Sequence, residues 1–90
     1  MSAPSRTVLI TNKRGLHARA SAKFVTLASA QAAVVEVEKD GSKVVGTSIM
    51  GLMMLGAAMG DSVTISASGE GAEAAVSALC DLVEAKFGED

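Results

Sequence analysis

Apolar and polar residues alternate in four short stretches of the chain, which is the pattern of half-buried β-strands. In the clearest stretch, Val35 and Val37 lie on one face, and charged residues occupy the other. Asp40-Gly41 follows directly, and this dipeptide is typical of a tight β-hairpin. The pattern predicts strands over residues 6–11, 33–39, 43–45 and 62–67.

Three other stretches carry apolar residues at helical spacing. The longest has Val76, Leu79, Val83 and Phe87 on one stripe. Ser48 is a preferred N-cap residue type and directly precedes a short apolar run. The pattern predicts helices over residues 18–29, 49–55 and 72–87, and a polar, glycine-containing loop over residues 12–16.

The predicted order of elements is β-α-β-β-α-β-α, which indicates a two-layer α+β fold with helices on one face of an antiparallel sheet. A length of 90 residues fits one domain over residues 1–90, and 49% apolar residues suffice for one core. Because only 2 residues are aromatic, that core has to consist of aliphatic side chains, Met and Ala.

The amino-acid composition argues against several functional classes. The formal net charge is only −2, which argues against a nucleic-acid-binding protein. No uncharged apolar run is long enough for membrane insertion, and residues 1–6 lack the apolar stretch of a secretory signal, so we expect a cytoplasmic protein. Cys80 is the only cysteine and is expected to be a buried, inert thiol. We expect no disulfide, no metal site and no cofactor.

Basic residues surround the only histidine of the chain, His17. A local excess of positive charge favours an anionic ligand or an acidic protein partner. The basic residues of this region are Arg6, Lys13, Arg14, Arg19 and Lys23.

His17 itself falls at the start of the first predicted helix. The first amides of a helix have no intrahelical partner and carry partial positive charge, so Ala18 and Arg19 can hold an anion there. The Arg19 guanidinium adds a permanently charged fork suited to phosphate, and Gly15 is expected to leave the approach uncrowded. An uncharged imidazole nitrogen is also a nucleophile near neutral pH. The pattern therefore predicts a histidine that carries a transferable phosphoryl group.

Two other functions remain open from the residues alone. A small hydrolase or phosphatase could use His17 as its nucleophile, but no acid–base partner lies near it in the sequence. A small α+β ligand-binding regulatory domain is the other alternative, although it does not explain His17 and Arg19 at a helix start.

Two segments resemble a known family. Residues 15–25, GLHARASAKFV, resemble the active-site segment of the histidine-containing phosphocarrier (HPr) family of the bacterial phosphotransferase system. Residues 48–56, SIMGLMMLG, resemble the regulatory-serine and partner-binding helix of the same family. The form of the first segment and the tail at residues 87–90 resemble the nitrogen-related (NPr) branch more than the sugar-uptake branch. The implied fold is an open-faced β-sandwich, a four-stranded antiparallel sheet covered by three helices.

The resemblance implies a monomeric phosphocarrier and not a stand-alone enzyme. His17 would accept the phosphoryl group on Nδ1 from enzyme I and pass it to an enzyme IIA, with Arg19 steadying the group. Ser48 would be a regulatory site for an HPr kinase/phosphorylase. The family's usual proline is Ala20 here, which frees one amide in the first turn without opposing the helix.

The short helix after Ser48 is too apolar to bury all its side chains on one face, so some of them are expected to form a partner-facing patch. The alternative is that all of them belong to the core. The residues predicted to bind a partner are Ile49, Leu52, Met53 and Ala20.

Overall fold

The computed structural model describes residues 3–89. Four strands, three α-helices and one 3₁₀ turn follow one another in the order βαββαβα, with the turn at the end. Their bounds are β1 Ser5–Leu9, α1 Ala18–Ser29, β2 Val34–Lys39, β3 Ser42–Val45, α2 Ile49–Met54, β4 Ser62–Ser68, α3 Ala72–Glu84 and η1 Lys86–Gly88.

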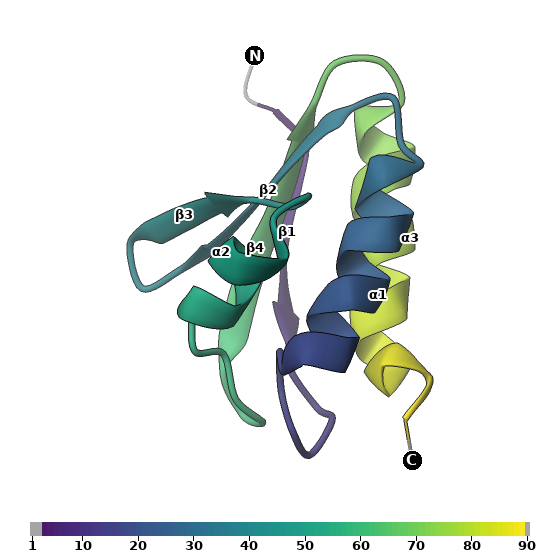
Figure 1. Ribbon diagram of the computed structural model, residues 1–90. Coiled ribbons are helices and arrows are strands. Elements are labelled where there is room, and N and C mark those ends of the chain that lie inside the picture. Colours follow the sequence, from purple (N-terminus) through teal and green to yellow (C-terminus); the bar gives the residue numbers. More distant parts are fainter. Residues whose placement is uncertain (1–2, 90) are drawn as a thin grey trace.

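The strands form one antiparallel sheet in the order β1-β4-β2-β3. Val8 pairs with Val63, and Ile65 pairs with Val37 across the two central strands, so these side chains point to the same face. The helices cover this face, with α1 and α3 side by side and the short α2 beside β3 (Figure 1). The predicted α+β class and the four-stranded antiparallel sheet under three helices are confirmed.

The core lies between the sheet and the helices, as the strand pattern requires. Val35, Val37 and Ile65 point into it from the sheet, and Phe24 and Leu79 meet them from α1 and α3. The remaining buried positions are filled by small and aliphatic side chains. Among the described residues, no helix is long and apolar enough to cross a membrane.

The hairpin between β2 and β3 confirms the interpretation of Asp40-Gly41. Both residues have positive φ, 51° and 84°, which is the geometry of a type I′ turn.

The end of the last helix differs from the prediction. The apolar stripe predicts a helix through Phe87, but α3 ends at Glu84. Lys86 and Phe87 then take left-handed backbone angles, with φ of 58° and 55°, and the chain turns through η1. Phe87 is nevertheless buried, because the turn swings its ring back into the core. The spacing therefore predicted burial correctly and helicity wrongly.

Candidate functional site

The imidazole of His17 caps the first turn of α1. His17 has extended backbone angles, φ −73° and ψ −179°, and its Nδ1 accepts a hydrogen bond of 3.2 Å from the Arg19 amide. An amide can only donate, so Nδ1 must be unprotonated, and the ring proton of the neutral form is on Nε2. The lone pair of Nδ1 thus points at the positive end of the helix.

The loop before His17 is fixed by contact with the segment that follows α2. The Leu16 amide donates to the Ala57 carbonyl at 2.9 Å, and the buried Ser21 hydroxyl donates to the Leu16 carbonyl at 3.1 Å. Gly15 is buried with φ +63°, and a Cβ there would lie 2.3 Å from the Ala57 oxygen. The expectation that Gly15 leaves room for an approaching anion is therefore wrong. The missing side chain makes room for the backbone of Ala57 instead.

Glu89 is the site residue that the sequence interpretation missed. Its Oε2 lies 2.5 Å from Nε2 of His17, 72 positions away in the sequence, and its Oε1 accepts from the Asn12 side-chain amide at 3.1 Å. The hydrogen bond with His17, followed by that with Asn12, lowers the pKa of the Glu89 carboxyl below its usual 4.5. Glu89 is therefore a carboxylate at neutral pH, paired with the ring nitrogen that faces away from the helix.

The Glu89–His17 contact also bears on the hydrolase alternative. No acid–base partner lies near His17 in the sequence, and this disfavours the hydrolase alternative. In the structure, the Glu89 side chain supplies a carboxylate next to the ring. No local signal could have found Glu89, because its position depends on the turn that ends α3.

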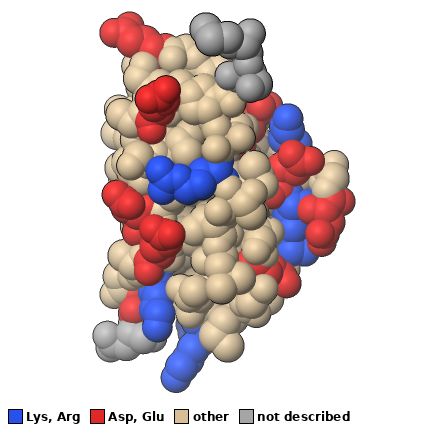
Figure 2. Space-filling model, turned by 180° about the vertical axis from the view of Figure 1, so that it is seen from behind, with Lys and Arg blue, Asp and Glu red and all other residues tan. Residues whose placement is uncertain are grey.

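Positive charge gathers around the histidine as expected, with one exception. Lys13, Arg14 and Arg19 line a hollow together with His17 and Glu89. Lys23 lies further along α1, where its Nζ donates to the Phe87 carbonyl at 2.7 Å. In Figure 2, Lys and Arg side chains project at the lower end of the molecule, and Asp and Glu side chains lie along both side edges, with further Lys and Arg among them. Arg6 is the exception, since it lies on β1 beside the start of α3 and Glu73.

Ser48 and α2 form the second predicted region. The Ser48 hydroxyl accepts from the Gly51 amide at 2.9 Å and so caps α2, as the sequence indicates. Ile49 and Met53 are 41% and 42% exposed and can contact a partner. Further exposed apolar side chains on and after this helix are Met50, Met54 and Met59. The alternative that the whole helix belongs to the core is therefore wrong.

The prediction that Leu52 and Ala20 bind a partner is wrong. Leu52 and Ala20 both have 0% exposed surface. Leu52 is the inward-facing residue of α2, and Ala20 lies in the first turn of α1 where that helix packs on the core. Neither residue therefore presents surface to a partner.

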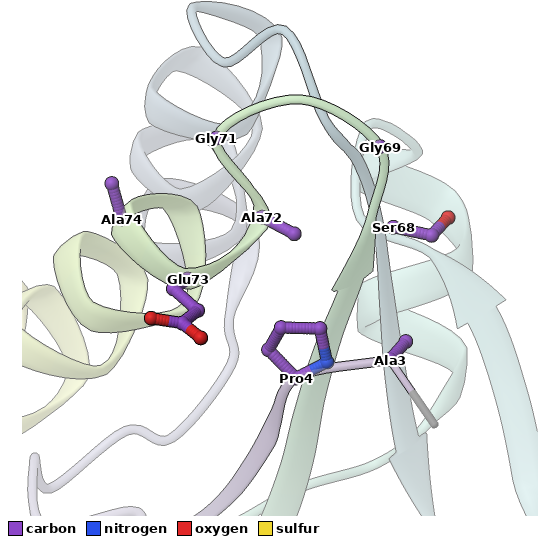
Figure 3. A pocket seen from close by; sticks show the side chains of 8 residues that line it. All are labelled: Ala3, Pro4, Ser68, Gly69, Gly71, Ala72, Glu73 and Ala74. Carbon is purple, nitrogen blue, oxygen red and sulfur yellow. The ribbon is translucent and has the colours of Figure 1, made fainter. Parts of the chain in front are cut away.

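Two further features of the described residues lie outside the His17 site. Cys80 is buried, and burial raises the pKa of its thiol, as expected of an inert cysteine. A hollow at the opposite end of the molecule from His17 lies between the N-terminal segment and the start of α3 (Figure 3). Among residues 3–89, Glu73 is the only titratable residue that lines it, and no Lys or Arg of that range does.

Comparison with known proteins agrees with this arrangement. Residues 4–85 match the family model described as "PTS HPr component phosphorylation site". The chain belongs to the HPr family. It is a phosphocarrier of the phosphotransferase system and not a stand-alone catalyst. It is 43% identical to the phosphocarrier protein NPr of Shewanella violacea over 99% of this chain and 98% of that protein. It is 48% identical to the phosphocarrier protein HPr of Neisseria meningitidis serogroup A over 93% and 94% of the two chains.

The fold comparison gives the same family. The crystal structure of HPr from Thermoanaerobacter tengcongensis superposes with a TM-score of 0.92 and 49% identity, covering 97% of this chain and 98% of that one. Since NPr and HPr proteins both occur among the relatives at similar identity, assignment to the nitrogen-related branch stays a prediction.

Proposed function

We propose that this HPr family member carries its phosphoryl group on Nδ1 of His17. The observation that supports this most strongly is the hydrogen bond from the Arg19 amide to Nδ1. It leaves Nδ1 unprotonated, as a nucleophile requires, and aims its lone pair at the helix start. A phosphoryl group on Nδ1 would replace this hydrogen bond and leave the Arg19 amide free to donate to a phosphoryl oxygen.

The first turn of α1 offers further stabilisation of that group. The amides of Ala18 and Arg19 belong to exposed residues and have no intrahelical partner. The Arg19 guanidinium is exposed next to them and can make a bidentate contact with phosphoryl oxygens. The positive end of the helix favours the dianionic group in the same place.

In the proposed cycle, enzyme I is the donor and an enzyme IIA is the acceptor. The exposed Ile49 and Met53 form the apolar part of the docking surface, because methionine adapts to differently shaped partners. The carrier acts as a monomer in the cytoplasm. Regulation through Ser48 is part of the proposal, since a phosphate at this cap would place negative charge next to the docking surface.

The test is transfer from phosphoenolpyruvate through purified enzyme I. We expect one acid-labile phosphoryl group per chain on the native protein and none on His17→Ala, whose retained fold is checked by circular dichroism. Arg19→Lys is the matched variant that keeps the charge but loses the bidentate fork, and it should be labelled more slowly. Labelling of His17→Ala at the native level would refute the assignment. Release of free phosphate from a small phosphate ester, abolished by the same substitution, would favour the hydrolase alternative instead.

A further inference from the structure

The segment after α3 folds back towards the start of α1 and is held there by burial of Phe87 and by hydrogen bonds. The Phe87 ring is 1% exposed within the core, and its carbonyl accepts a hydrogen bond of 2.7 Å from Nζ of Lys23 on α1. The Glu89 amide donates to the Lys86 carbonyl at 2.9 Å, which closes the turn. Positive φ at non-glycine residues is uncommon, so the left-handed angles of Lys86 and Phe87 show that tertiary contacts determine the path of this segment.

Asn12 fixes the carboxylate at the end of that segment. The Asn12 side chain is fully buried, and its Nδ2 group donates to the Gly15 carbonyl at 2.9 Å and to Oε1 of Glu89 at 3.1 Å. An amide nitrogen has two protons, so both are used, and a flipped amide would lose both bonds. Oε2 of Glu89 is thereby presented to Nε2 of His17. The loop before α1 and the chain end thus converge on one ring nitrogen.

We infer that Glu89, oriented by Asn12, is a positioning residue for phosphoryl transfer that keeps a proton on Nε2 of His17 before and after phosphorylation. This inference rests on the proposed function. With Nε2 protonated, the only lone pair of the ring is on Nδ1, so the nitrogen at the helix start is the one that reacts. The carboxylate also offsets the positive charge that the ring acquires on phosphorylation.

The bonds and charges balance without an additional reactant. In acceptance, the Nδ1 lone pair forms the N–P bond, the bond from phosphorus to the donor breaks with its electrons on the donor, and the ring becomes a cation. In donation, the acceptor's nucleophile bonds to phosphorus and the N–P electrons return to Nδ1. Because the Nε2 proton stays in place, His17 leaves as a neutral imidazole and not as an imidazolate. It is restored in the tautomer with which it began.

The test compares Glu89→Gln, which keeps an acceptor oxygen without the charge, with Glu89→Ala, which lacks both. Glu70→Gln is the control, because it removes the same charge at the far end of the molecule. Lys13, Arg14, Arg19 and Lys23, the other charged groups around the site, are the same in every variant. The measurements are the exchange of the His17 Nε2 proton by NMR and the rates of transfer to and from the carrier between pH 6 and pH 9.

We expect transfer from the phosphorylated carrier to slow by about threefold to tenfold at pH 8 in Glu89→Gln, with a further loss in Glu89→Ala, because a charge-assisted hydrogen bond is roughly twice as strong as a neutral one. The effect should lie in kcat with KM unchanged, should grow with pH, and should be accompanied by faster exchange of the Nε2 proton. Glu70→Gln should match the native protein.

Normal labelling of His17 together with unchanged rates and exchange in both Glu89 variants would overturn this inference and leave the proposed function intact. A change confined to KM would also overturn it, because Glu89 would then contribute to docking. Absence of labelling in the native protein would remove the proposed function, and this inference with it.

Discussion

Replacement of Gly15 by alanine tests how tightly the loop before His17 is held. Gly15 has φ +63°, and an added Cβ would lie 2.3 Å from the Ala57 oxygen and 2.7 Å from the Ala58 Cα. Both atoms belong to backbone, so no side chain can move aside to make room. Gly56 provides a matched control, because its φ is +66° and a Cβ there meets nothing within 4 Å.

The two substitutions share one cost and differ in another. Left-handed backbone costs an alanine about 1–2 kcal/mol relative to a favourable conformation, and this applies equally at both positions. At Gly15 the loop must also move away from Ala57, which breaks the hydrogen bond of 2.9 Å from the Leu16 amide and leaves polar groups unpaired. An unsatisfied buried group costs about 1–3 kcal/mol. The expected loss of unfolding free energy is therefore about 2–5 kcal/mol for Gly15→Ala and about 1–2 kcal/mol for Gly56→Ala.

Urea denaturation of the two variants measures this difference in unfolding free energy, provided that their m-values are equal. At a temperature where both are folded, Gly15→Ala should also accept phosphoryl groups more slowly, because the shifted loop displaces the His17 ring from the Arg19 amide. Gly56→Ala should be phosphorylated at the native rate. Equal stability losses in the two variants would refute the close contact with Ala57, and an unchanged transfer rate in Gly15→Ala would show that the loop does not position His17.

Three further expectations follow from the contacts described. Ser48→Asp should slow transfer from enzyme I. Ser48→Ala should keep its transfer rate and lose only the hydrogen bond that caps α2 at the Gly51 amide, which costs about 1 kcal/mol of stability in thermal or urea unfolding. Equal transfer rates for both variants would refute regulation through charge. Leu52→Ala should cost about 2–5 kcal/mol of stability, because Leu52 is buried. Met53→Ala should leave stability nearly unchanged and raise the KM for enzyme I. A larger stability loss in Met53→Ala than in Leu52→Ala would contradict the burial of Leu52. Because the pKa of Glu89 is lowered in the folded protein, the stability that Glu89 contributes is fully present above pH 4.5 and is lost as the pH falls through the folded pKa. The difference in Tm between the native protein and Glu89→Gln should therefore shrink on acidification. A difference that grew would contradict the pairing of Glu89 with His17.

The sequence predicts most of the fold because its local signals agree with one another. The β2–β3 hairpin is predicted by the alternation at Val35 and Val37 and by the Asp40-Gly41 turn. The start of α2 is predicted by Ser48, an N-cap residue directly before an apolar run. Local preference and burial pattern point to the same elements at these positions. His17 at the start of α1 could be predicted for the same reason, since a helix N-terminus is a local feature.

The parts that the sequence did not predict depend on tertiary contacts. Nothing in the helical spacing of α3 indicates that the chain leaves the helix before Phe87, because the ring is buried in either conformation. The meeting of Asn12, Glu89 and His17 joins the two ends of the chain and follows only from that turn. Burial of Leu52 depends on which side of α2 faces the sheet, which six residues are too few to determine.

The central claim is that the phosphoryl group resides on Nδ1 of His17, next to the first amides of α1. The most direct test is NMR of the ¹⁵N-histidine-labelled protein after phosphorylation by enzyme I and phosphoenolpyruvate, because ³¹P–¹⁵N coupling identifies the bonded nitrogen. The account predicts coupling to Nδ1, a proton retained on Nε2, and a downfield shift of the Arg19 amide as it donates to the phosphoryl group. Coupling to Nε2, or phosphate on a residue other than His17, would contradict it.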